Sequence, residues 1–403
     1  MTKDIAAILA SPGFASAADA LRGQHDRFVE EIIAITEIPA PPFKENRRAV
    51  ALERMFREHE LEEVRRDEIG NVIGLRRGRA NGTTVAVAAH LDTVFPEGTD
   101  CTVRREGTKL FAPGVGDDGR GLAALLAYIR ALDAGMIETE ADLLFVCDVG
   151  EEGKGDLRGV RHLLTEGPYR DRIDAFFTID GLELETITTV AVGSYRYRVT
   201  FRGPGGHSFN AFGTVNPAYA LGAFLAGMAQ VEVKDDPRTT FCASVFGGGS
   251  SINAIPEEVW VEIDLRSEDQ QALDRLDAEI RRLIDGAVEG ENACADRSSG
   301  EIAAEIRRIG NRPAGRTDHD LPIVQAAFAA LQAFDFAART GASSTDANIP
   351  MSLGIPAIRV GSGGTGGRAH SLEEWIDVEP ELSIRGLTAG LATILGTAGM
   401  RHD

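Results

Sequence analysis

The sequence predicts an α/β fold, in which an α/β/α sandwich with a mixed sheet is interrupted by an inserted α+β domain. Apolar strand-like runs alternate with helical periodicity in the first and last parts of the chain. In the middle, the pattern changes to alternating strands separated by helices. The 403 residues also exceed what one compact core usually holds. We expect a first part of the sandwich at residues 1–189, the insertion at 190–313 and a second part at 314–403.

The first part begins with apolar residues at helical spacing on both sides of a proline-rich break at 39–42. The run at 84–89 is continuously apolar, which is typical of a strand covered on both faces. The other elements expected here are strands at 72–75, 142–149 and 175–179 and helices at 122–132 and 160–164. Alternation of this kind predicts helices packed in layers on a sheet.

The insertion begins where residues 188–201 alternate between apolar and polar side chains. Helices at 215–228 and 270–284, strands at 241–246 and 259–265, and a last strand within 289–312 are expected to complete it. Helical periodicity at 321–334 and an apolar strand at 358–360 then return the chain to the sandwich.

The amino-acid composition argues against two classes of binding partner. The formal net charge of -20 repels phosphate backbones and anionic membrane surfaces, so neither nucleic acid nor membrane is expected as a partner. No run approaches the roughly 20 apolar residues of a membrane span, and the early apolar run 5–10 is shorter than the core of a signal peptide. We therefore expect a cytoplasmic protein, whose four scattered cysteines are small buried side chains rather than disulfides.

Polar residues that bind metals follow several of the expected strands. H-L-D-T-V places His90 at the end of a buried strand with Asp92 two residues on, and an imidazole whose other ring nitrogen donates to a carboxylate is a good metal ligand. By itself the H-x-D pattern is equally typical of a surface loop. G-V-G-D-D-G-R-G sets Asp117 beside a second aspartate, and like charges side by side cost free energy unless a cation compensates them. A phosphate site at this glycine-rich turn is disfavoured because the aspartates oppose an anion.

Four further carboxylate and imidazole groups complete the set. Glu151 and Glu152 follow the strand at 142–149, and as neighbours they point apart, so one can bind a metal while the other acts as a base. Asp180 follows the strand at 175–179, and His370 lies in a glycine-rich segment near the C-terminus. None is informative alone, but together they predict a metal centre beyond the ends of the strands.

These residues, in this order, resemble the M20 family of metallopeptidases and amidohydrolases, which includes carboxypeptidase G, peptidase T, succinyl-diaminopimelate desuccinylase and acetylornithine deacetylase. The resemblance covers nearly the whole chain. It rests on H-L-D-T-V, G-D-D-G, E-E-G and A-H-S-L-E-E in the sandwich and on G-G-H-S, N-A-I-P and D-L-R in the insertion.

The resemblance implies two divalent ions, with zinc expected and cobalt or manganese as alternatives. Asp117 would bridge them, Glu152 and His370 would complete the shell of one, and His90 and Asp180 that of the other. Asp92 would orient His90, and Glu151 would be the general base that takes a proton from the attacking water and passes it to the leaving nitrogen.

The insertion would then be the family's lid and dimerisation domain, which implies a homodimer. His207 in G-G-H-S would donate to the oxyanion, in the same or the partner subunit. Arg266 and Asn253 would bind a substrate carboxylate, although Arg266 could instead pair with a neighbouring acid.

Three functions remain open at this point. The first is an exopeptidase that acts on di- or tripeptides, favoured because S-S-T-D-A-N at 343–348 resembles the peptidase T side of the family. The second is an N-acyl amino acid deacylase with the same metals. The third, a catalytically silent relative that binds peptides, requires loss of a ligand or of the base, and every expected one is present.

Overall fold

The computed structural model describes residues 5–59, 61–79 and 82–400. The chain forms two compact units. Met1–Ala191 and Arg316–Asp403 make up the first, which we call the sandwich unit, and Val192–Gly315 make up the second, the inserted unit. Each is described by itself below.

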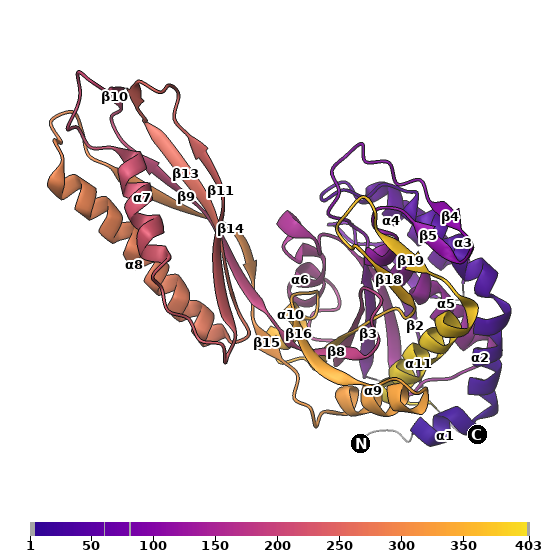
Figure 1. The fold of residues 1–403 in the computed structure, drawn as a ribbon. Helices are drawn as coiled ribbons and strands as arrows, with labels where there is room; N and C mark the ends of the chain where they lie inside the picture. Colours follow the sequence, from indigo (N-terminus) through magenta and orange to yellow (C-terminus); the bar gives the residue numbers. More distant parts are fainter. Residues whose placement is uncertain (1–4, 60, 80–81, 401–403) are drawn as a thin grey trace. The chain divides into compact units, whose positions relative to one another are not determined.

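The sandwich unit is built on one mixed sheet of nine strands, in which the predicted parallel strands lie at the centre (Figure 1). β3 pairs in parallel with β6 and β7, and β7 pairs in parallel with β17, whereas β2 and β6 are antiparallel. The order along the sheet is β1 (Glu62–Arg66), β2 (Val72–Arg76), β6 (Asp142–Asp148), β3 (Thr84–His90), β7 (Ala175–Ile179), β17 (Ala357–Val360), β8 (Thr186–Ala191) and β15 (Gly315–Arg316), with β16 (Arg339–Ser343) pairing with β8. This confirms the predicted α/β class with a mixed sheet.

Helices cover both faces of this sheet, because alternate residues of its buried strands point to opposite sides. In β3, Val85 and Val87 join one core while Ala86 and Ala88 join the other. The first core is closed by α1 (Ile5–Ala10), α2 (Pro12–Gly23), α3 (His25–Thr36), α4 (Asn46–Arg57), α5 (Arg120–Ala134), α9 (Pro322–Ala333) and α11 (Pro380–Ala398). The second core is closed by α6 (Arg158–Thr165) and α10 (Asn348–Ser352), on the opposite face in Figure 1.

A small second sheet of the sandwich unit joins segments far apart in the chain. Its order is β18 (Thr365–Gly367), β19 (Trp375–Asp377), β5 (Lys109–Phe111) and β4 (Arg104–Glu106). Ile376 pairs with Leu110 at its centre. The segment around His370 is thereby held against the segment that leads to Asp117.

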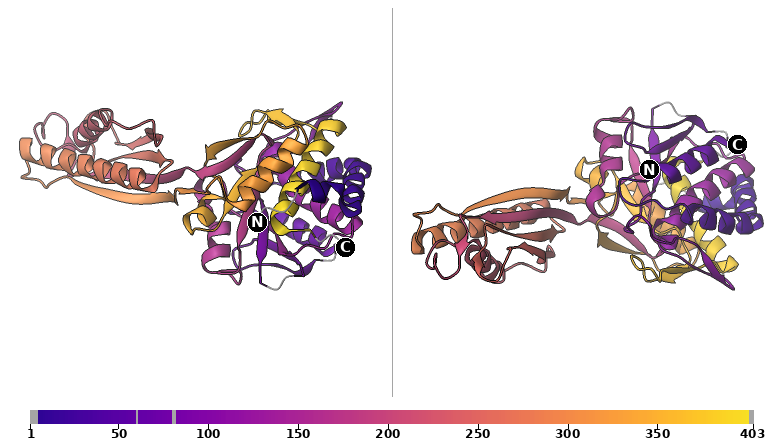
Figure 2. Two further views of the ribbon diagram at one scale, coloured as in Figure 1. Left: turned by 90° about the horizontal axis from the view of Figure 1, so that it is seen from below. Right: turned by 90° about the horizontal axis from the view of Figure 1, so that it is seen from above.

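The inserted unit is a four-stranded antiparallel sheet with two helices on one face (Figures 1 and 2). Its order is β11 (Thr239–Gly248), β13 (Glu258–Ser267), β9 (Gly193–Arg202) and β14 (Ala303–Arg312), and its helices are α7 (Pro217–Met228) and α8 (Gln270–Cys294). Val261, Ile263 and Leu265 of β13 pack under the helices, and the residues between them face the other way. Two short strands, β10 (Gly206–His207) and β12 (Ala254–Ile255), pair beyond the sheet.

The structure corrects several expected elements. Residues 188–201 form two strands in different sheets, because the chain passes from β8 to β9 at Val192. α8 extends to Cys294, ten residues past the predicted end, since Ala287 still packs against the core. The expectation of buried cysteines holds for Cys101 and Cys147 and is wrong for Cys242 and Cys294, which are exposed; all four are free thiols. Among the described helices, none combines the length and the apolar character that crossing a membrane requires.

Candidate metal centre

The carboxyl ends of three adjacent parallel strands bring the first candidate ligands to one edge of the sheet. His90 is the last residue of β3 and lies opposite Asp148 at the end of β6. Glu152 follows β6 after a short turn, and Asp180 follows β7 directly. This is the edge at which open α/β sheets carry their binding sites.

Asp117 reaches the same edge from the glycine-rich turn before α5. Gly114 has a φ of 76°, a conformation that side chains disfavour, and it packs closely on Thr93. A Cβ at Gly121 would lie 2.1 Å from Oδ1 of Asp118, so the buried carboxyl of Asp118 requires a glycine there. The G-D-D-G-R-G pattern therefore has a steric cause: it allows two adjacent aspartates to turn into a helix while one of them is buried.

Asp117 lies at the centre of the cluster, with its two oxygens on different imidazoles. Oδ1 is 2.9 Å from Nε2 of His90, and Oδ2 is 3.0 Å from Nε2 of His370. Nε2 of His370 is also 2.9 Å from Oε1 of Glu152. His90, Asp117 and Glu152 each offer a ligand atom within 4.8 Å of the others.

The cluster has the electrostatics of a cation site. Hydrogen bonds to Asp117 and Glu152 raise the pKa of His370 to about 11. Burial disfavours the charged form of His90, but the hydrogen bond to Asp117 and the surrounding aspartates raise its pKa well above the usual value. Hydrogen bonds from both imidazoles lower the pKa of Asp117 despite its burial. The carboxylates thus stabilise positive charge within the cluster.

The donor set fits divalent metal ions. Two imidazole nitrogens and several carboxylate oxygens are the ligands that zinc and similar ions take. Ligand atoms about 2.1 Å from a tetrahedral ion lie about 3.4 Å apart, so the separations of 2.9–3.0 Å need only a small opening to admit an ion. One oxygen of Asp117 lies beside His90 and the other beside His370.

Asp180 stands outside this hydrogen-bonded group in the part of the chain that the structure describes. Its carboxyl is partly buried, and burial together with repulsion from Asp117 raises its pKa, while Arg359 opposes the shift. The carboxyl group of Asp180 therefore interacts electrostatically with the cluster.

Asp92 acts on the cluster differently from the expectation. Nδ1 of His90 lies 2.9 Å from the backbone carbonyl of Asp92 and 3.9 Å from its carboxylate. The carboxylate instead accepts N–H groups from Gly150, Glu151 and Glu152 at 2.8, 3.0 and 2.9 Å. Asp92 thus orients His90 through its main chain and fixes the turn of Glu151 and Glu152 through its side chain. Glu151 is 6% exposed at this turn.

Sequence reasoning missed further buried groups around the cluster. Arg48 donates to the carbonyls of Leu91, Ile38 and Thr36 and so supports the end of β3. Asp148 and Asp346 are fully buried, and burial raises the pKa of both carboxyls. Asp346 lies within S-S-T-D-A-N, a polar segment whose composition gives no sign that this aspartate is buried.

The remaining three candidates belong to the inserted unit. His207 and Asn253 are exposed and adjoin the paired strands β10 and β12, beyond the end of the sheet that holds Arg202 and Glu258. Arg266 lies near the opposite end, eight residues along β13 from Glu258, or about 26 Å. Its Nε donates to Asp264 at 2.7 Å, which is the neighbouring acid that the sequence left open. The inserted unit does not bring Arg266 together with the other two.

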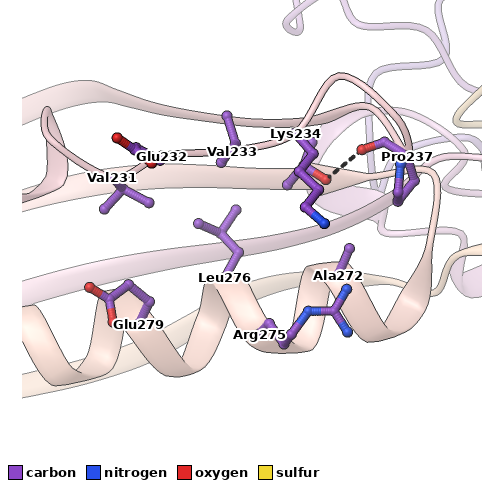
Figure 3. A pocket seen from close by; sticks show the side chains of 10 residues that line it. Val231, Glu232, Val233, Lys234, Pro237, Ala272, Arg275, Leu276 and Glu279 are labelled. Carbon is purple, nitrogen blue, oxygen red and sulfur yellow. Dashed lines mark hydrogen bonds between the residues drawn. The ribbon is translucent and has the colours of Figure 1, made fainter.

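A groove of about 300 Å³ in the inserted unit is unrelated to the cluster (Figure 3). It lies between the segment before β11 and helix α8, with Leu276 and Ala272 on its floor and Lys234 and Arg275 at one end. None of the residues that line it is a candidate ligand.

Comparison with known proteins identifies the family to which the chain belongs. The model of peptidase family M20/M25/M40 matches residues 86–395. The succinyl-diaminopimelate desuccinylase of Corynebacterium glutamicum is 27% identical over 58% of this chain, and the match spans 64% of that enzyme's own length. The aminopeptidase PepT of Bacillus cereus has a similar structure, with a TM-score of 0.74, 19% identity and coverage of 92% of this chain and 98% of that one. A dinuclear metal binding peptidase from the M20 family of Bacillus subtilis gives a TM-score of 0.67 and 18% identity, over 93% of this chain and 99% of that one.

The family model covers well over half of the chain and includes every residue of the cluster. The similar solved structures share the whole fold, insertion included. The chain therefore belongs to peptidase family M20/M25/M40 and is a metal-dependent hydrolase.

Proposed function

We propose that the protein is a two-metal exopeptidase that hydrolyses di- or tripeptides. The observation that carries the proposal is the position of Asp117, whose two oxygens face His90 on one side and His370 with Glu152 on the other. Such a carboxylate is suited to two ions, which we take to be zinc, with cobalt or manganese as alternatives. The dinuclear peptidase among the similar structures supports this number of ions.

When bound, two divalent ions polarise an amide carbonyl and acidify the attacking water. The residues of the chain supply the rest of the reaction. Glu151, fixed by the hydrogen bond from its N–H to Asp92, takes a proton from the water and returns it to the leaving nitrogen. His90, Asp117, Glu152, Asp180 and His370 would hold the ions. The products are a free carboxylate and a free amine.

His207 is suited to stabilise the oxyanion. Its Nδ1 accepts the backbone N–H groups of Phe209 and Asn210 at 3.3 and 3.4 Å, which places the proton of a neutral imidazole on the exposed Nε2. A tripeptide is about 11 Å long, so one inserted unit cannot offer both His207 and Arg266 to the same substrate. We infer that the two residues serve different active sites of a homodimer, with His207 acting in the partner subunit.

Exposed apolar groups of the inserted unit support such a dimer. β11 is an edge strand, and its Val245 and Phe246 are 46% and 53% exposed. An unpaired edge with apolar side chains favours pairing with another chain. The four cysteines of the chain are free thiols, which is typical of proteins of the cytoplasm. We therefore propose a cytoplasmic location.

A second function, an N-acyl amino acid deacylase, is favoured by the desuccinylase relative. It would use the same metals and base with a different pocket for the acyl group. The peptidase is preferred because S-S-T-D-A-N resembles peptidase T and because the aminopeptidase has the same fold.

The deciding experiment is hydrolysis by the purified, zinc- or cobalt-loaded protein of a panel of free dipeptides, tripeptides, and N-acetyl and N-succinyl amino acids. We expect cleavage of peptides with a free amino group, lost with a chelator and restored by metal. Cleavage of the acylated compounds alone would move the function to a deacylase. Hydrolysis that persists in chelator after dialysis would contradict the metal centre.

A further inference from the structure

Glu374 is a buried carboxylate beside the cluster that has no part in the reaction described above. It is 2% exposed. Its Oε1 accepts the N–H groups of Gly116 and Asp117 at 2.7 and 2.9 Å, and its Oε2 accepts that of Gly114 at 3.0 Å. One side chain therefore fixes three amides of the turn that carries the central ligand.

The turn is shaped to receive this carboxylate. A Cβ at Gly116 would lie 3.2 Å from Oε1 of Glu374 and 3.0 Å from Ile376, so a glycine allows the close approach. Gly114, with its positive φ, directs its N–H toward Oε2. Two of the glycines of the sequence motif thus serve the contact with Glu374.

Glu374 also belongs to the segment that carries another ligand. It follows His370 by four residues and precedes β19, and its carbonyl accepts the N–H of Ala112 at 3.1 Å. The same residue therefore joins the His370 segment to the Asp117 turn by its main chain and by its side chain. The two candidate ligands lie more than two hundred residues apart in the sequence, and Glu374 is in contact with both of their segments.

The stability of the fold alone does not explain why a glutamate is buried at position 374. Removing a carboxylate from water costs several kcal/mol, and the pairing of β5 with β19 already holds the two segments together. The geometry instead suits orientation, because three N–H groups of one turn converge on this carboxylate. Groups that hold a ligand in place in this way are typical neighbours of metal sites.

We propose that Glu374 is a positioning residue that fixes the turn of Asp117 relative to His370 and so sets the affinity of the centre for metal, without contact to metal or substrate. This inference rests on the metal centre of the proposed function.

The test replaces Glu374 by Gln and by Asp in the full chain. Gln keeps one acceptor oxygen but turns an NH₂ group toward one of the amides, and Asp keeps the charge but is one methylene too short to reach all three. The matched control is Glu373→Gln, because Glu373 is the exposed neighbour, paired with Arg368. Three quantities are measured: the Kd for zinc in competition with a chelating dye, the visible spectrum of the cobalt form, and the Tm of the metal-free protein.

We expect both Glu374 variants to bind zinc about 10- to 100-fold more weakly than the wild type and to show an altered cobalt spectrum. The Tm of their metal-free forms should stay close to that of Glu373→Gln, which should bind zinc as the wild type does. Wild-type affinity in Glu374→Gln would overturn the inference, as would wild-type affinity in Glu374→Asp, which would assign the effect to charge alone. A fall in the metal-free Tm that accounts for the lost affinity would make the role merely structural. Absence of zinc binding by the wild type would instead contradict the metal centre itself.

Discussion

The candidate residues converge in one unit of the molecule and are spread out in the other. In the sandwich unit, His90 at the end of β3 and His370 of the C-terminal segment lie 2.9 and 3.0 Å from Asp117, and Glu152 lies 2.9 Å from His370. In the inserted unit, His207 and Arg266 lie near opposite ends of the sheet. The first arrangement brings side chains from distant segments into one cluster. The second keeps its candidate residues apart, so they do not form one site within the inserted unit.

The largest effect expected concerns the base. Glu151→Gln removes the proton acceptor but keeps its size, and general bases contribute about 10²- to 10⁴-fold, so kcat should fall by that factor while zinc content stays the same. Steady-state kinetics on the best peptide of the panel and metal analysis check this. Glu166→Gln, an exposed glutamate of the same unit, serves as control. Unchanged hydrolysis in Glu151→Gln would assign the base elsewhere.

His207→Ala should lower kcat by about 10²- to 10³-fold, because it removes one oxyanion donor. Mixing it with Glu151→Gln tests where His207 acts. If His207 serves the partner subunit, mixed dimers have one complete site, and about a quarter of the wild-type activity returns after exchange of subunits. Mixtures as inactive as their parents would place His207 in its own subunit and remove the main argument for the dimer.

Arg266→Ala should lower kcat/KM by about 10- to 100-fold, mainly through KM, because a hydrogen bond to a charged group is worth about 1.5–3 kcal/mol. The control is Arg198→Ala, since Arg198 makes a similar ion pair with Glu262 on neighbouring strands. An equal effect in both variants would show that Arg266 serves the sheet through Asp264 and does not bind substrate.

Asn253→Ala should have the smallest effect, about fivefold on KM, since a neutral hydrogen bond contributes about 1 kcal/mol. Its Oδ1 already accepts from Ser251 at 2.6 Å, so only the amide NH₂ is offered to a ligand. Substrates with and without a free carboxylate distinguish the roles. A loss that is the same for both would contradict recognition of that carboxylate.

The strands that carry the metal centre could be predicted because burial on both faces leaves a continuous apolar run. β3, β6 and β7 were expected within a residue or two of their observed ends. Parallel neighbours end at the same edge, so the positions of His90, Glu152 and Asp180 followed from the topology. The roles given to these residues came from the resemblance to the family.

The groups that support the centre could not be predicted, because their partners are main-chain amides. Nothing in the spacing of Asp92 or Glu374 tells which N–H groups their carboxylates accept, since those turns form only in the folded chain. The division of residues 188–201 between β8 and β9 was missed for a related reason: both strands alternate, and only their tertiary surroundings separate them. By contrast, α2 carried a visible signal in Ser11 and Pro12, its cap and first residue.

The place of β17 in the sheet determines the order in which the parts of the protein can fold during synthesis. This strand lies between β7 and β8, but it follows the whole inserted unit in the chain. A nascent chain therefore completes the inserted unit while the sheet still lacks a strand near the first ligands, and His370 emerges later still. Domains generally fold as units during translation, so the inserted unit is expected to fold on the ribosome before the metal centre can exist. Metal capture is then among the last events in the maturation of this enzyme.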